Sequence, residues 1–110
     1  MCGILPGTFF VAIDENQQLR GFIQVGLRSH ADGCDVSRSV GYIEGWFVEE
    51  RFRGAGVGRR LMEAAEEWSR GMQCTEVASD ALLENEVSQR AHGALGFEVV
   101  DRVVTFRKRL

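Results

Sequence analysis

The sequence predicts a single domain of the α/β (α+β) class, built from a mixed, mostly antiparallel sheet and two helices. Three observations carry this prediction. The first half of the chain holds three strand-length apolar segments, two later segments have apolar residues at helical spacing, and a short apolar segment separates those two. The expected order over residues 1–110 is strand, strand, strand, helix, strand, helix, strand, with no linker or internal repeat.

The first two strands are expected to form an antiparallel hairpin. Residues 8–14 (TFFVAID) and 19–29 (LRGFIQVGLRS) flank the turn sequence ENQQ. A third strand follows at residues 40–50 (VGYIEGWFVEE). Simple alternation divides its side chains between two faces, with Tyr42, Glu44, Trp46 and Val48 on one and Ile43 and Phe47 on the other.

The second half of the chain alternates helices and strands. Apolar residues at helical spacing from Val57 to Met72 predict a helix that stops near Gly71. A short strand, TEVASDA, ends in Asp80, and ENEVSQRAHGALGF predicts a second helix with Gly96 at its C-terminal cap. The last residues, FEVVDRVVTFRKRL, are expected to close the sheet as one long or two short strands.

The composition narrows the function classes. With 110 residues, 45% hydrophobic and 26% charged, the chain is typical of an ordinary soluble domain. Its net charge of −3 argues against nucleic-acid binding, and no segment has the length or pattern of a membrane span or signal peptide. We expect a cytoplasmic protein, no metal, and reduced thiols at Cys2, Cys34 and Cys74.

The stretch RFRGAGVGRRL, residues 51–61, predicts an anion site. Glycines at the junction of a strand and a helix let backbone N–H groups approach a phosphate, and the helix N-terminus adds favourable dipole charge. Arg53, Arg59 and Arg60 can add charged contacts. The alternative is a turn that only packs tightly. The spacing fits neither a Walker A loop, which needs a following Lys, nor a G-x-G-x-x-G dinucleotide fingerprint.

The stretch does fit R-x-x-G-x-G, through Arg53, Gly56 and Gly58, and so resembles the pyrophosphate loop of the GNAT acyl-CoA-dependent N-acyltransferases. The element order and the LGF at residues 95–97 are also similar to that superfamily. The segments YIEGWFV, ASDALLENEVSQRAHGALGF and VVTFRK resemble the bacterial aminoglycoside 6′-N-acetyltransferases. This resemblance covers residues 8 to 110. Members of that family have a strand and one or two helices before the hairpin, and residues 8 to 110 contain no counterpart of them. We therefore expect an N-terminally abbreviated GNAT fold.

The resemblance implies acetyl-CoA as cofactor and assigns residues to it. The backbone of Phe47 and Val48 is expected to pair with the pantetheine arm like an added strand. Asn85 and, with less support, Ser88 are expected at the cofactor arm, with helix capping as the alternative for Asn85. The pyrophosphate is expected at Arg53, Gly54, Ala55, Gly56, Val57, Gly58 and Arg59.

Glu44 and Asp80 are the candidates for the acceptor amine. A carboxylate on an apolar strand is costly to bury without a partner, so Glu44 is expected either to bind the acceptor ammonium and take its proton or to pair with Arg28 or Arg102. Asp80 follows the next strand, and by resemblance it is a second anchor for a cationic sugar amine. A cap on the following loop or helix is an equal alternative.

His92 is the candidate acid for the leaving thiolate. It stands where many GNAT enzymes have a tyrosine, five residues before the Phe of LGF, and an imidazolium can donate a proton near neutral pH. The alternative is a half-exposed helix histidine, and thiolates leave well enough that no acid is required.

The resulting prediction is an acetyl-CoA-dependent N-acetyltransferase that acts on a primary amine, the 6′-amine of an aminoglycoside above all. A polyamine or peptide acceptor is one alternative, and a binding module for acyl-CoA with little catalysis is the other. We also expect a homodimer, because the family commonly pairs its C-terminal strands and an abbreviated domain leaves apolar surface to cover.

Overall fold

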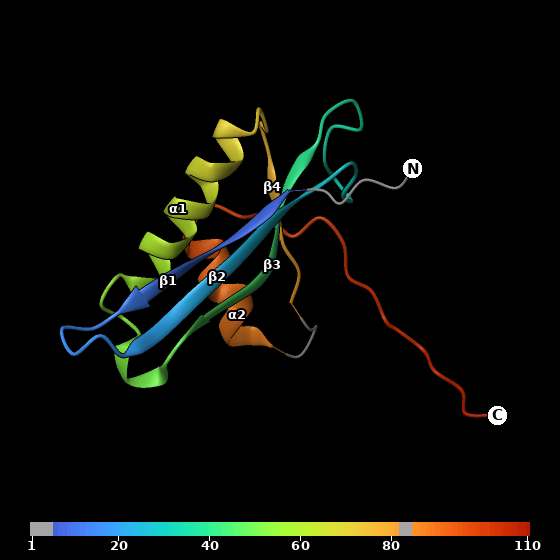
Figure 1. Ribbon diagram of the computed structural model, residues 1–110. Coiled ribbons are helices and arrows are strands. Elements are labelled where there is room, and N and C mark those ends of the chain that lie inside the picture. The colour runs from blue at the N-terminus through green and yellow to red at the C-terminus, as the bar shows by residue number, and fades with distance from the viewer. Residues whose placement is uncertain (1–5, 82–84) are drawn as a thin grey trace. The chain divides into compact units, whose positions relative to one another are not determined.

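The structure is a computed structural model, and it describes residues 6–81 and 85–110 (Figure 1). The chain forms two compact units, residues 1–79 and residues 80–110. Among the described residues, no helix is both long and apolar enough to cross a membrane.

The first unit contains a four-stranded sheet in the order β1-β2-β3-β4. The strands are β1 (Gly7–Ile13), β2 (Leu19–Arg28), β3 (Val40–Val48) and β4 (Val77–Ala78). The first three are antiparallel, whereas β4 runs parallel to β3 and pairs only through Val77 and Ala78. The predicted hairpin and mixed sheet are therefore confirmed.

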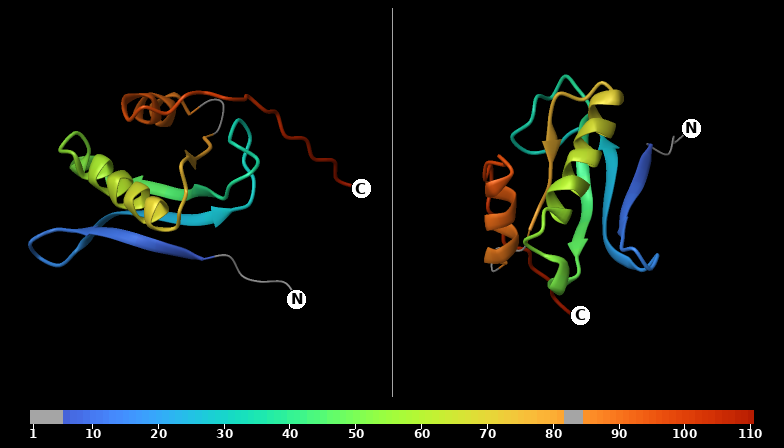
Figure 2. Two further views of the ribbon diagram at one scale, coloured as in Figure 1. Left: turned by 90° about the horizontal axis from the view of Figure 1, so that it is seen from above. Right: turned by 90° about the vertical axis from the view of Figure 1, so that its left-hand side faces the viewer.

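Helix α1 (Val57–Gly71) connects β3 to β4 and lies along one face of the sheet (Figure 2). It ends at the predicted Gly71, and its buried residues lie one turn apart, which is the periodicity that the sequence shows. The core of this unit lies between α1 and the sheet. Its fully or nearly fully buried apolar residues include Ile23, Val25, Val40, Ile43, Leu61, Met62 and Ala65.

A β-bulge in β3 corrects the predicted division of its faces. Gln24 pairs with Gly45 and Val25 with Ile43, so Glu44 is an extra residue that has no partner in β2. The extra residue shifts the alternation by one position. Trp46 consequently lies on the α1 face, where its Nε1 donates to the Gly58 carbonyl at 3.2 Å. The prediction that Tyr42, Glu44, Trp46 and Val48 share one face was wrong, because alternation holds only in a strand without a bulge.

The second unit contains α2 (Glu86–Ala94) and the C-terminal segment. Asn85 caps α2 by accepting from the Ser88 N–H at 3.0 Å, and Gly96 takes the left-handed conformation (φ 91°) just after the helix, as predicted. The closing strand does not form. Residues 97–110 pair with no strand in the described part of the chain, and Val103, Val104 and Phe106 are 64%, 67% and 92% exposed. Their alternation favours a strand, but a strand needs a neighbour with which to pair.

Candidate functional site

A loop with left-handed glycines joins β3 to α1. After a short 3₁₀ helix, η1 (Glu50–Phe52), Gly54 and Gly56 adopt φ of 81° and 86°. Other residues adopt such angles only with strain, which explains the glycines at these two positions. Gly56 is the N-cap of α1, and no side chain in the described part of the chain caps this helix. The first N–H groups of α1 are thus available for an anion.

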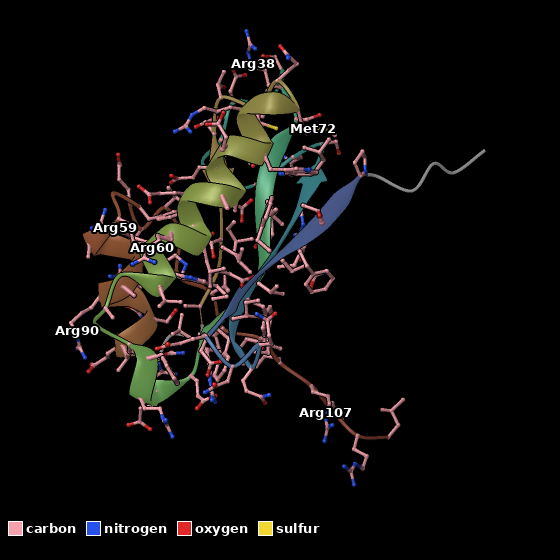
Figure 3. The ribbon with its side chains drawn as sticks, turned by 60° about the vertical axis from the view of Figure 1, so that its left-hand side comes forward. Arg38, Arg59, Arg60, Met72, Arg90 and Arg107 are labelled. Carbon is pink, nitrogen blue, oxygen red and sulfur yellow. The ribbon has the colours of Figure 1, made fainter. Side chains whose placement is uncertain are left out.

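The charges around this loop favour an anion as well. Arg59 and Arg60 lie on the first turn of α1, at the opposite end of the helix from Met72 (Figure 3). That first turn carries no acidic residue. Positive side chains, a helix N-terminus and a glycine turn together fit the pyrophosphate of a CoA-type molecule.

Arg53 connects the loop to the end of β3. Its Nε donates to the Val48 carbonyl at 2.8 Å, and its guanidinium carbon lies 5.9 Å from the centroid of the Phe47 ring. The side chain of the first residue of the R-x-x-G-x-G pattern therefore holds the loop against the strand. The sequence predicted Arg53 only as a contact of the bound anion.

Of the described strands, only β4 pairs with the edge of β3 that faces away from β2, and it does so only at Gly41 and Tyr42. The Glu49 N–H donates to the Arg20 carbonyl at 2.8 Å, so by the alternation of an antiparallel ladder the peptide groups of Trp46 and Val48 point away from β2. The bond from Arg53 to the Val48 carbonyl agrees with this direction. Phe47 and Val48 were predicted as backbone contacts of the cofactor. The Val48 peptide faces this edge, whereas the same alternation turns the Phe47 peptide toward β2, which does not fit the prediction for Phe47.

Glu44 lies on the same strand and forms an ion pair. Its two carboxylate oxygens accept from Nε and Nη2 of Arg28 at 3.3 Å and 2.9 Å, which is one of the two alternatives that the sequence left open. The Arg28 guanidinium carbon lies 3.5 Å from the centroid of the Tyr42 ring. Glu44 is 35% exposed, so the carboxylate is paired and still accessible to solvent.

The other candidate residues belong to the second unit. Ser88 supplies both the N–H that Asn85 caps and a carbonyl 2.7 Å from Nδ1 of His92. The His92 ring also makes an edge contact with Phe97 at 5.1 Å between centroids. Asp80 is exposed. These local contacts match the structural alternatives for Asn85 and His92, and the cofactor and acid roles of these residues stay predictions.

Cysteine and metal chemistry receive no support from the described residues. Burial raises the pKa of the thiols of Cys34 and Cys74, so the reactive thiolate is disfavoured at both positions. Cys2 lies outside the described residues. Within residues 6–81 and 85–110, no group of three or more metal-ligating side chains comes together.

The chain matches a known protein family over most of its length. The model of the Acetyltransferase (GNAT) family matches residues 2–97, and the chain therefore belongs to the GNAT acetyltransferases. Its curated relatives include an aminoglycoside N(6′)-acetyltransferase type 1 from Klebsiella aerogenes, 42% identical over 105 residues. These residues are 96% of this chain and 68% of the relative. A protein of the same name from Salmonella typhimurium is 41% identical over 101 residues, 91% of this chain and 68% of its own.

Solved structures agree. An aminoglycoside 6′-N-acetyltransferase, AAC(6′)-Iy, in complex with the bisubstrate analogue CoA-S-monomethyl-acetylneamine matches with a TM-score of 0.84 and 39% identity, over 94% of this chain and 70% of that one. AAC(6′)-Ih from Acinetobacter baumannii matches with a TM-score of 0.83 and 33% identity, over 94% of this chain and 71% of its own. The resemblance inferred from the sequence and the expected GNAT fold are thus confirmed.

Proposed function

We propose that this acetyltransferase moves an acetyl group from acetyl-CoA to the 6′-amine of an aminoglycoside. One observation carries the proposal. The part of the β3 edge with which no described strand pairs lies within a few residues of the Glu44 carboxylate. The peptide groups of Trp46 and Val48 point to this edge, the Val48 carbonyl accepts from Arg53, and Glu44 lies two residues before Trp46. The similarity to enzymes that are named for this reaction supports the choice of acceptor.

Acetyl-CoA supplies an acetyl thioester whose carbonyl carbon accepts the amine. The loop from Arg53 to Gly58 and the first turn of α1 would hold the pyrophosphate, and this edge of β3 would hold the pantetheine arm. Asn85 and Ser88 are proposed as further contacts of that arm. The glycine turn and the uncapped helix start are the features of this chain that fit the cofactor.

The acceptor arrives as an ammonium ion and must lose a proton before it can attack. Glu44 is proposed to hold this ammonium and take the proton, directly or through a water. Asp80 is proposed as a second anchor for the cationic sugar, and His92 as the donor of a proton to the leaving thiolate. Direct attack by the amine agrees with the raised pKa of the Cys34 and Cys74 thiols, which disfavours an acylated cysteine at these positions.

We further propose a homodimer and a cytoplasmic location. The exposed valines of residues 99–104 offer apolar surface to a second copy. Free thiols at Cys34 and Cys74 suit a reducing compartment.

Thiol release from acetyl-CoA with two matched aminoglycosides, one with a 6′-amine and one with a 6′-hydroxyl, tests the function. Turnover is expected with the amine alone. Glu44→Gln keeps the shape of the side chain but removes the base, so kcat is expected to fall about a hundredfold or more. Wild-type turnover with the hydroxyl compound, or an unchanged kcat for Glu44→Gln, would contradict the proposal.

The same assay separates the two alternatives. Turnover with a polyamine or peptide and none with aminoglycosides would indicate a GNAT enzyme with another acceptor. Saturable binding of CoA without turnover on any amine would indicate a binding module.

A further inference from the structure

The ion pair between Arg28 and Glu44 places a positive charge in the site proposed for a positively charged acceptor. The guanidinium binds both carboxylate oxygens, at 3.3 Å and 2.9 Å. The side chains of Arg28 and Glu44 are 46% and 35% exposed. A ligand can therefore reach the pair from solvent.

Arg28 is itself held in place. Its guanidinium carbon lies 3.5 Å from the centroid of the Tyr42 ring, which is within the range of a cation–π contact. Tyr42 and Glu44 both belong to β3, and Arg28 ends the neighbouring strand β2. The ring fixes the guanidinium and the guanidinium fixes the carboxylate, so the direction of the Glu44 oxygens follows from the sheet.

The pairing leaves Glu44 able to bind an amine. A carboxylate has about four acceptor positions on its two oxygens, and a side-by-side arginine uses about two of them. An ammonium ion at the remaining positions would lie about 5 Å from the positive charge of Arg28, and this repulsion weakens binding by about fivefold. Arg28 thus has two separable effects: it orients the base and it repels the cation.

On the basis of the proposed function, we infer that Arg28 is a positioning residue that orients Glu44 and that its positive charge weakens the binding of the cationic acceptor. Orientation affects the rate of the chemical step, whereas repulsion affects binding before the reaction. Loss of Arg28 should therefore lower kcat and also lower KM. A side chain that only supports the fold would not move these two quantities in this way.

Two substitutions separate the effects. Arg28→Gln removes both the charge and the paired contact, so kcat is expected to fall about tenfold and the KM for the aminoglycoside to fall about fivefold at low salt. High salt should remove the KM gain. Arg28→Lys keeps the charge without the two-armed contact, so its KM should stay at the wild-type value while kcat stays low.

Arg70→Gln is the matched control. It also removes one positive charge, from an exposed pair with Glu67 at 3.2 Å on α1, and is expected to leave kcat and KM unchanged. Circular dichroism and thermal unfolding would check that each variant folds, and Arg28→Lys still reports if Arg28→Gln does not fold.

The outcomes are distinct. Unchanged kinetics for Arg28→Gln, or a raised KM with unchanged kcat, in an active wild type would overturn this inference and leave the proposed function standing. A wild type without turnover on any aminoglycoside would overturn the proposed function, and this inference with it.

Discussion

The two units of the chain hold their candidate site residues by different means. In residues 1–79 the glycine loop and Glu44 belong to elements with a shared core, in which Ile23, Val25 and Ala65 are completely buried. In residues 80–110 no described residue is buried, and Asn85 and His92 are held by hydrogen bonds to the nearby Ser88. A buried core holds a site through contacts between residues that are far apart in the sequence, whereas these hydrogen bonds join residues of a single helix.

This difference predicts where the stability of the domain lies. The buried side chains of the first unit pack between α1 and the sheet, so their truncation leaves cavities. Valines in the second unit are already in contact with solvent, so their truncation costs little unless a second copy of the chain covers them.

Met62→Ala should destabilise the protein more than the other substitutions proposed below. Met62 is 1% exposed, on the face of α1 toward the sheet, so its truncation should lower the free energy of unfolding by about 2–5 kcal/mol. The matched truncation in the second unit is Val104→Ala, where the side chain is 67% exposed and the expected change is below about 0.5 kcal/mol. Urea unfolding followed by circular dichroism measures both. If the loss of stability caused by Val104→Ala grows with protein concentration, a second copy of the chain covers this side chain, which would indicate a dimer.

Asn85→Ala tests how α2 is held within the second unit. It removes the cap of α2, which is expected to cost about 1 kcal/mol, whereas Asn85→Asp keeps an oxygen that can accept from the Ser88 N–H. Amide hydrogen exchange should show lost protection in α2 alone, with β2 and β3 unchanged. Lost protection in the sheet as well would show that the two units unfold together.

The contribution of Asp14 to stability depends on pH. Bonds to Asp14 from the Gln18 backbone, the Arg20 side chain and the Asn16 backbone lower the pKa of this carboxyl below its ordinary value of 3.8. A carboxyl with a lowered pKa stabilises the folded state above that ordinary value, and the contribution is lost as the pH falls through the lower folded value. Asp14→Asn should therefore be less stable than wild type at pH 7.

Denaturant midpoints at pH 7 and at about pH 2 measure this dependence, and the difference between wild type and Asp14→Asn should shrink in acid. Glu63→Gln, an exposed position on α1, is the control for removing one negative charge. A difference that stays constant with pH would mean that Asp14 acts through packing rather than through its charge.

The sequence was sufficient for features that depend on local patterns. Apolar spacing predicted α1 and its end at Gly71, turn residues predicted the hairpin, and Gly96 predicted the end of α2. Glycines 54 and 56 predicted the loop, because a left-handed backbone restricts residue type. The sequence was insufficient where distant pairing decides. The bulge at Glu44 depends on the register with β2, and the closing strand depends on a partner that residues 97–110 do not have in this structure.

The bulge at Glu44 separates the carboxylate from the strand pairing of the sheet. Without this one residue, Ile43, Gly45 and Trp46 would follow plain alternation along β3, and each would keep its present partner in β2. The carboxylate is therefore an insertion into a strand that is complete without it. Deletion of Glu44 would therefore remove the carboxylate and leave the pairing of Ile43, Gly45 and Trp46 with β2 in register.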